Sequence, residues 1–211
     1  MIKLCVFDFD STLMDGETLD IFANSYGVGE EVSKITKLAM AGELDFFEAL
    51  QKRVSLLKGM DEDEIIRLSH NLTYMNGAKE LIAKLKENGV RVVVFSGGFR
   101  VATSFAKNIL NFDVDFANIL HTKDKKLTGL VGGDMMFGYS KGDMLNRLQW
   151  LLNISKDETM SVGDGANDIS MFEHSRVKVA FCAKEILKKS ANVIVDEKDL
   201  TKIVSMVDIK S

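Results

Sequence analysis

The 211-residue sequence contains no proline and only two cysteines. Without proline, its turns and helix ends have to rely on glycine, asparagine, aspartate and serine. Cys5 and Cys182 both lie in apolar, strand-like stretches, which predicts reduced core residues of the kind found in cytoplasmic proteins. Two cysteines, together with three histidines that show no metal-like spacing, also argue against a zinc site.

The sequence also lacks a long hydrophobic run and an excess of one charge. No stretch approaches the roughly 18 uninterrupted apolar residues of a membrane span. A net charge of −4 with mixed signs, and scattered aromatic residues, argue against nucleic-acid binding. The chain opens with the strand-like MIKLCVF rather than with a secretory signal pattern. We therefore expect a cytoplasmic protein, monomeric or homodimeric, with no membrane or nucleic-acid partner.

The sequence does contain a regular alternation of strands and helices, which one block of helices interrupts. KLCVFDF is typical of a short buried strand, whereas the stretch from about residue 17 to 73 shows only helical spacing of apolar residues. From about residue 76, helix and strand patterns alternate, apart from a predicted hairpin formed by FANILHT and LTGLVGG.

This pattern predicts an α/β fold. We expect a Rossmann-like, doubly wound parallel sheet with helices on both faces and a small inserted α-helical cap. The core domain is expected in residues 1–14 and 77–211, and the cap domain in residues 15–76.

Polar residues gather where the predicted strands end and helices begin. In an open parallel sheet, ligands bind beyond the carboxyl ends of the strands. The residues that the sequence places there are Asp8 and Asp10, then Ser96-Gly97-Gly98, then Lys141, and finally Asp164, Asn167 and Asp168. Four separate segments are therefore expected to converge on one edge of the sheet.

The residue types in these segments suggest a metal and phosphate site. Asp8 and Asp10 are two apart on an extended chain, so both side chains can face one ligand. Asp164 and Asp168 are four apart at a helix start and can share a face. Carboxylates at close range repel one another unless a cation lies among them, and hard oxygen ligands favour magnesium.

Phosphate oxygens would find donors in the other segments. The Ser96 hydroxyl and the Gly97 amide can hold them, because glycine lets the backbone approach closely. Lys141 would supply a positive charge. Taken singly, each motif has an ordinary explanation: D-x-D and SGG occur in turns, GDGAND could be a plain acidic or calcium-like loop, and Lys141 could be a surface charge. The joint order and placement of the motifs favour the site.

DFDST, SGG, a later lysine and GDGANDISMF, in this order, resemble the four motifs of the haloacid dehalogenase-type phosphatase superfamily. KRVSLLKG and VGDGANDISMF are most similar to its phosphoserine phosphatase family, and the similarity extends over nearly the whole chain, cap included. P-type ion pumps share two of the motifs but are excluded by the length of this chain and its lack of membrane spans.

The resemblance implies a division of roles in the core. Asp8 would be the nucleophile that becomes an aspartyl phosphate, and Asp10 would move protons. Magnesium would be held by Asp8, the backbone carbonyl of Asp10 and Asp164, with Asp168 supporting them. The phosphoryl group would be bound by Ser96, Gly97 and Lys141, with Asn167 beside it.

The resemblance also assigns roles in the cap. Glu17 would receive the substrate ammonium, Arg53 would bind its carboxylate, and Met40 and Phe46 would form an apolar lid. On residue chemistry alone, simpler explanations stand beside these. Glu17 could stabilise a helix dipole, Arg53 could be a solvated charge, and the two apolar residues could be core.

The activity implied is the magnesium-dependent hydrolysis of O-phosphoserine to serine and phosphate, the last step of serine biosynthesis. The alternatives are a phosphatase for another small phosphomonoester, a phosphotransferase to an alcohol such as homoserine, and a silent phosphate- or metal-binding module. The silent module is disfavoured because Asp8, Asp10, Lys141 and Asp164 are all present.

Members of the resembled family commonly carry proline near Asn76 and at the position of Glu185, and this chain has none there. These differences affect turns and the position of the cap, and they leave the motif residues unchanged.

Overall fold

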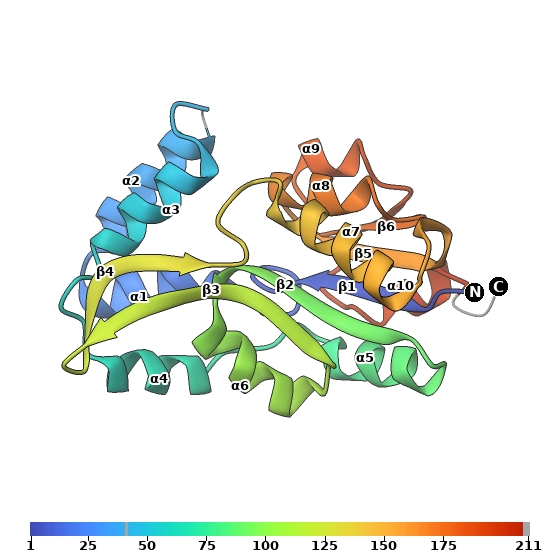
Figure 1. The fold of residues 1–211 in the computed structure, drawn as a ribbon, viewed down its shortest axis with the longest axis horizontal. Coiled ribbons are helices and arrows are strands. Elements are labelled where there is room, and N and C mark those ends of the chain that lie inside the picture. The colour runs from blue at the N-terminus through green and yellow to red at the C-terminus, as the bar shows by residue number, and fades with distance from the viewer. Residues whose placement is uncertain (41, 209–211) are drawn as a thin grey trace.

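The structure, a computed structural model, describes residues 1–40 and 42–208. A seven-stranded sheet in the order β4-β3-β2-β1-β5-β6-β7 forms its centre (Figure 1). All neighbouring strands are parallel except β3 and β4, which form the predicted antiparallel hairpin. The strands are β1 Leu4–Asp8, β2 Arg91–Phe99, β3 Val114–Lys123, β4 Lys126–Gly133, β5 Thr159–Gly163, β6 Val177–Phe181 and β7 Val193–Val195.

Helices cover both faces of this sheet, as the alternating pattern predicts. Cys5 and Phe7 of β1 join an apolar cluster with α5 and α6, whereas Leu4 and Val6 join a second cluster with α7 and α8 on the other face. The covering helices are α5 Ala78–Glu87, α6 Arg100–Leu110, α7 Ser140–Leu152, α8 Ile169–Phe172, α9 Glu185–Lys188 and α10 Lys202–Met206. The α/β, doubly wound fold predicted from the sequence is confirmed.

Four further helices lie between β1 and α5, where the cap is predicted: α1 Thr18–Tyr26, α2 Gly29–Met40, α3 Phe46–Ser55 and α4 Glu62–His70. Local signals define their ends. Gly27 ends α1 with φ of 83°, a conformation that glycine adopts without steric cost, and the Asp45 carboxylate caps α3 by accepting from the Glu48 amide at 2.8 Å. In Figure 1, α2 and α3 project side by side away from the sheet.

The inserted helices share their apolar core with the β3–β4 hairpin. Leu127 of β4 packs with cap residues such as Phe22 and Leu50. The backbones also pair, because the Gly59 amide donates to the Leu127 carbonyl and the Leu127 amide donates to the Met60 carbonyl, each at 2.8 Å. The hairpin therefore forms part of the base on which the inserted helices sit. The domain boundaries at residues 14/15 and 76/77 remain a prediction.

Two details differ from the sequence expectations. β2, which the sequence predicts to end in Ser96-Gly97-Gly98, continues one residue further to Phe99, and its pairing with β3 is irregular between Ser96 and Phe99. The helix start expected at Asp164 and Asp168 is a 3-10 turn over Ala166–Asp168, which directly precedes α8. No helix within residues 1–40 and 42–208 combines the length and apolar character needed to cross a membrane.

Candidate active site

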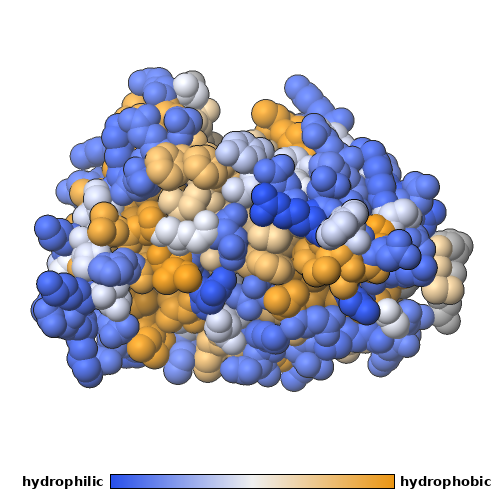
Figure 2. Space-filling model, in the orientation of Figure 1, coloured by the Kyte–Doolittle hydropathy of each residue, from blue (hydrophilic) through white to orange (hydrophobic). Residues whose placement is uncertain are grey.

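The candidate site lies at the carboxyl ends of β1, β2 and β5, which are neighbours in the sheet. Asp8 is the last residue of β1, Ser96 and Gly97 lie near the end of β2, and Asp164 directly follows β5. Lys141 reaches the same edge from the first turn of α7. The convergence of four segments predicted from the sequence is thus present. Figure 2 shows the surface notched between the projecting α2–α3 pair and the α8–α9 region.

A buried lysine links two of the aspartates. The Lys141 ammonium lies 2.7 Å from Asp8 Oδ1 and 2.6 Å from Asp168 Oδ1. All three side chains are almost completely withdrawn from solvent. Burial acts to lower the pKa of Lys141, but the two carboxylates outweigh it and raise this pKa above its usual range. Lys141 therefore stays charged, and its explanation as a solvated surface residue does not fit.

Asp168 holds the loop after β5 in place. Its Oδ2 accepts from the backbone amides of Asp164 and Gly165, each at 3.0 Å, while its Oδ1 binds Lys141. Gly163 permits this arrangement, since a Cβ at that position would overlap the Asp168 carboxylate. Asp168 thus connects the helix that carries Lys141 with the loop that carries Asp164.

Three carboxylates in the site are close enough to bind one cation. Oxygen atoms of Asp8, Asp164 and Asp168 all lie within 4.8 Å of one another. Burial, and then the Asp168 charge, raise the pKa of Asp8 well above its usual value, and the same two causes raise the pKa of Asp164 to about 6. A cation would relieve this repulsion, and oxygen-only ligands suit a hard divalent metal. The buried aspartate cluster therefore could bind a metal.

The side chain of Asp10 has a different environment from that of Asp8. Asp10 Oδ1 accepts from the Thr18 amide at 2.9 Å, and Asp10 Oδ2 accepts from the Thr18 hydroxyl at 3.1 Å. Burial, followed by the nearby Glu17 charge, raises the pKa of Asp10 to about 8. Near neutral pH Asp10 is therefore mostly a neutral acid that can donate a proton. Its side chain is not among the three that cluster as potential metal ligands.

The SGG segment is held tightly against Asp10. The Ser96 hydroxyl is fully buried and accepts from the Gly98 amide at 2.9 Å. A Cβ at position 98 would lie 2.5 Å from Asp10 Oδ2 and 2.6 Å from the Thr18 hydroxyl, so only glycine fits there. Asn167 is partly buried on the loop after β5, and a Cβ at position 165 would lie 2.7 Å from its Oδ1. All predicted phosphate-binding residues therefore lie on the elements that form this edge of the sheet.

Two supporting residues carry no recognisable sequence signal. Thr18 binds Asp10 from the first position of α1, eight residues later in the chain. Asn118 of β3 is fully buried; it donates to the Gly97 and Met135 carbonyls and accepts from the Met135 amide. Asn118 thereby connects the SGG segment to the segment that leads into α7. Only the folded chain places these residues beside the motifs, so their spacing could not have identified them.

The predicted cap residues have fewer contacts. Glu17 is exposed at the edge of the site, where it accepts from the Ser11 hydroxyl at 2.7 Å, and desolvation by the surrounding protein raises its pKa. Arg53 is partly buried and its Nε donates to the Ala49 carbonyl at 3.2 Å. Burial lowers the pKa of Arg53, and Glu17 is the first of the carboxylates that counteract this. The two residues thus lie close enough for their charges to interact.

The two predicted lid residues differ in position. Phe46 lies next to the SGG segment, because a Cβ at Gly97 would come within 3.1 Å of its ring. Met40, the last residue of α2, is 68% exposed, so most of its side chain lies in solvent. The lid role of Met40 therefore remains a prediction.

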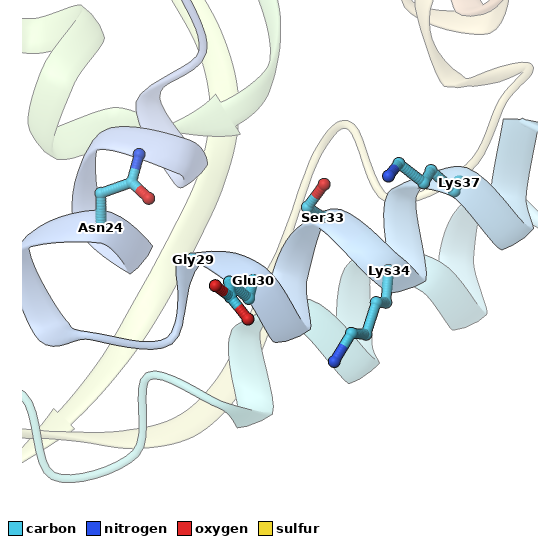
Figure 3. A pocket seen from close by; sticks show the side chains of 6 residues that line it. All are labelled: Asn24, Gly29, Glu30, Ser33, Lys34 and Lys37. Atoms are coloured by element: carbon cyan, nitrogen blue, oxygen red, sulfur yellow. The ribbon is translucent and has the colours of Figure 1, made fainter.

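A second hollow lies on the cap and contains none of the predicted site residues. It lies on the surface where the end of α1 meets α2. Its lining residues are Asn24, Gly29, Glu30, Ser33, Lys34 and Lys37 (Figure 3). All of its charged side chains are exposed and they carry both signs, so it offers no buried group that would fix a ligand.

Comparison with known proteins supports the class that this fold and site indicate. The haloacid dehalogenase-like hydrolase model matches residues 2–176, and the chain belongs to that family of hydrolases. Its relatives include the phosphoserine phosphatase of Wolinella succinogenes, 60% identical with 97% of this chain and 99% of the relative covered, and that of Campylobacter jejuni subsp. doylei, 55% identical with 98% and 100% covered.

Two similar solved structures are a phospho-aspartyl intermediate analogue of phosphoserine phosphatase and a substrate-bound phosphoserine phosphatase complex. Each is 45% identical to this chain with a TM-score of 0.93, and each comparison covers at least 98% of both chains.

Proposed function

We propose that this protein is a magnesium-dependent phosphatase that hydrolyses O-phosphoserine to serine and phosphate, the last step of serine biosynthesis. The observation that carries the proposal is the buried Asp8–Lys141–Asp168 arrangement at the end of β1, with a neutral Asp10 beside it. The relatives named phosphoserine phosphatase, similar along nearly the entire chain, support the choice of substrate. We place the reaction in the cytoplasm, in line with the two free cysteines.

The carboxylate cluster fits a magnesium ion. Asp8, Asp164 and the backbone carbonyl of Asp10 would hold it, and Asp168 would support Asp164 through the loop amides that it binds. When bound, the ion lowers the pKa of the clustered carboxylates and offsets the negative charge of the phosphate.

The first step that we propose forms a covalent phosphoenzyme. A carboxylate oxygen of Asp8 attacks phosphorus, and the bond between phosphorus and the serine oxygen breaks. Asp10, which its raised pKa keeps protonated, gives its proton to the departing serine oxygen. The products of this step are serine and an aspartyl phosphate at Asp8.

In the second step water releases the phosphate. Asp10 is now a carboxylate and takes a proton from the water that attacks phosphorus. The bond between phosphorus and Asp8 breaks, which regenerates the free carboxylate and a protonated Asp10. Throughout, the Ser96 hydroxyl, the Gly97 amide and the charged Lys141 would hold the phosphoryl oxygens, with Asn167 beside them.

The cap would select the substrate. Phosphoserine carries an ammonium and a carboxylate beyond its phosphate ester. Glu17 would receive the ammonium, and the Arg53 guanidinium would bind the planar carboxylate. Phe46, already beside Gly97, and Met40 would exclude water once the cap lies over the substrate.

The test measures phosphate release from O-phosphoserine, with and without magnesium, against a panel of small phosphomonoesters. The proposal expects magnesium-dependent release with O-phosphoserine as the preferred substrate. A better substrate in the panel would show a different phosphatase. Transfer of the phosphoryl group to added homoserine, faster than its release, would show a phosphotransferase. No turnover of any substrate would indicate a silent module.

A further inference from the structure

Three aromatic rings form a continuous stack between the cap and the core. Phe47 is in the first turn of α3, whereas Phe137 and Tyr139 lie in the segment between β4 and α7. The centroids of Phe47 and Phe137 are 5.1 Å apart with an interplanar angle of 10°, and those of Phe137 and Tyr139 are 5.3 Å apart with 8°. These distances and angles lie in the range of attractive offset stacking.

Phe47 also packs against the apolar cluster of the inserted helices, whereas the other two rings of the stack are exposed to solvent. Phe137 is 42% exposed and Tyr139 is 58% exposed. Phe46, the neighbour of Phe47, lies beside the same segment, because a Cβ at Gly138 would lie 4.0 Å from the Phe46 Cβ. The first turn of α3 therefore holds the segment with two adjacent aromatic side chains.

On the core side, the stack is connected to Lys141. The Phe137 amide donates to the Ser140 hydroxyl at 3.1 Å, and the Ser140 amide donates to the Phe137 carbonyl at 3.0 Å. These two bonds close a turn directly before Lys141 in α7. At its other end the segment is fixed by Asn118, which binds both backbone groups of Met135. The rings thus stand on a segment that is held at both ends.

We propose that Phe47, Phe137 and Tyr139 act as an aromatic latch that holds α3 over the site and so positions Phe46 and Arg53 for the substrate. The proposal rests on the proposed function, because its kinetic readout is phosphoserine turnover. Phe46 and Arg53 lie seven residues apart on the same helix, so anchoring its first turn restricts both. The three rings are positioning residues, since none is assigned a contact with the reacting atoms.

The test replaces each ring with leucine, which keeps an apolar side chain but removes the stack. For Phe47→Leu, Phe137→Leu and Tyr139→Leu we expect KM for O-phosphoserine to rise about three- to tenfold, with kcat within about twofold of wild type. Tyr139→Phe keeps the ring and should restore the wild-type KM. The double variant F47L/F137L should raise KM by less than the product of the two single effects, because both substitutions remove the Phe47–Phe137 stack.

A matched control removes a stack elsewhere. Phe105 of α6 stacks on His70 of α4 with centroids 4.0 Å apart, and neither residue belongs to the proposed site. Phe105→Leu should leave KM unchanged. An unchanged KM in Phe137→Leu, or an equal rise in Phe105→Leu, would overturn the latch.

Backbone hydrogen exchange separates the latch from the proposed function, since it needs no substrate. In Phe137→Leu, amides in α3 should exchange faster than in wild type, while those in α1 and α4 should not change. If the wild-type protein failed to hydrolyse O-phosphoserine, the proposed function would fail, but faster exchange in α3 would still support the latch. Unchanged exchange in α3 would refute it.

Discussion

The core edge of the site and its cap side are built in different ways. On the core edge, Asp8 and Asp168 are buried and each binds the buried Lys141 directly. On the cap side, Met40 is 68% exposed, and Arg53 has one hydrogen bond to its own helix. The chemical groups are thus preorganised by direct contacts with one another, whereas the selecting side chains make few contacts of their own. Substitutions in the core should therefore reduce kcat, and substitutions in the cap should alter KM and substrate choice.

The largest effect is expected for the proposed nucleophile. Asp8→Asn keeps the shape of the side chain but removes the attacking carboxylate oxygen, so kcat for phosphate release should fall by about 10⁴-fold or more. The measurement is phosphate release from O-phosphoserine at saturating magnesium. Turnover close to that of wild type would show that Asp8 is not the nucleophile.

The next effect concerns Asp10. Its pKa of about 8 means that it is already mostly neutral near pH 7, so Asp10→Asn should change the melting temperature little. The same substitution removes the proton donor and should lower kcat by about 10²- to 10⁴-fold.

The pH dependence of the wild type provides a second test of Asp10. Formation of the phosphoenzyme should slow as the pH rises through about 8, because Asp10 then loses its proton. This pH dependence should be absent from the residual activity of Asp10→Asn.

The buried lysine should matter for stability as well as for turnover. Lys141→Ala leaves Asp8 and Asp168 without their cation and should lower the free energy of unfolding by about 3–5 kcal/mol. Removal of the lysine raises the folded-state pKa of Asp8 further above its unfolded value. Protonation then favours the folded state, so the deficit should be largest above that folded-state pKa and should shrink as the pH falls below it.

An exposed ion pair provides the control for that substitution. Lys52 and Glu48 on α3 lie 2.8 Å apart, but both side chains are about half exposed. Lys52→Ala should change the free energy of unfolding by less than about 1 kcal/mol. Denaturant unfolding of both variants tests the comparison, and equal losses would contradict the role given to burial.

A smaller kinetic effect, on KM, is expected for the substrate-selecting arginine of the cap. Arg53→Ala should raise KM for O-phosphoserine about 10- to 100-fold, since it removes a charge-assisted contact with the substrate carboxylate. O-phosphoethanolamine has the same ammonium but no carboxylate, so its KM should hardly change. Glu17→Gln provides the converse test, because it should weaken both substrates. An equal effect of Arg53→Ala on both substrates would argue against the proposed carboxylate contact.

Much of this arrangement could be predicted from the sequence. Asp8, Lys141 and Asp164 each lie at a strand end or helix start, and Ser96 lies near the end of β2. The topology of a parallel sheet brings such ends together. The helical spacing between β1 and α5 likewise predicted the inserted helices.

Features that depend on tertiary contacts could not be predicted. Two-residue spacing put Asp8 and Asp10 on one side of the chain, but it did not show that Thr18 binds Asp10 or that Asp168 binds Lys141. The local sequence predicts only a strand position for Leu127, yet this side chain packs against the inserted helices. Such contacts join segments far apart in sequence, where local periodicity carries no information.

The most direct measurement is the detection of the covalent intermediate. Wild-type protein is mixed with O-phosphoserine and magnesium, quenched in acid within one turnover, and digested for mass spectrometry. We predict a phosphoryl group on Asp8, and its absence from the Asp8→Asn variant treated in the same way. Phosphate release at the wild-type rate without a phosphoryl group on Asp8, or with that group on another residue, would contradict the mechanism.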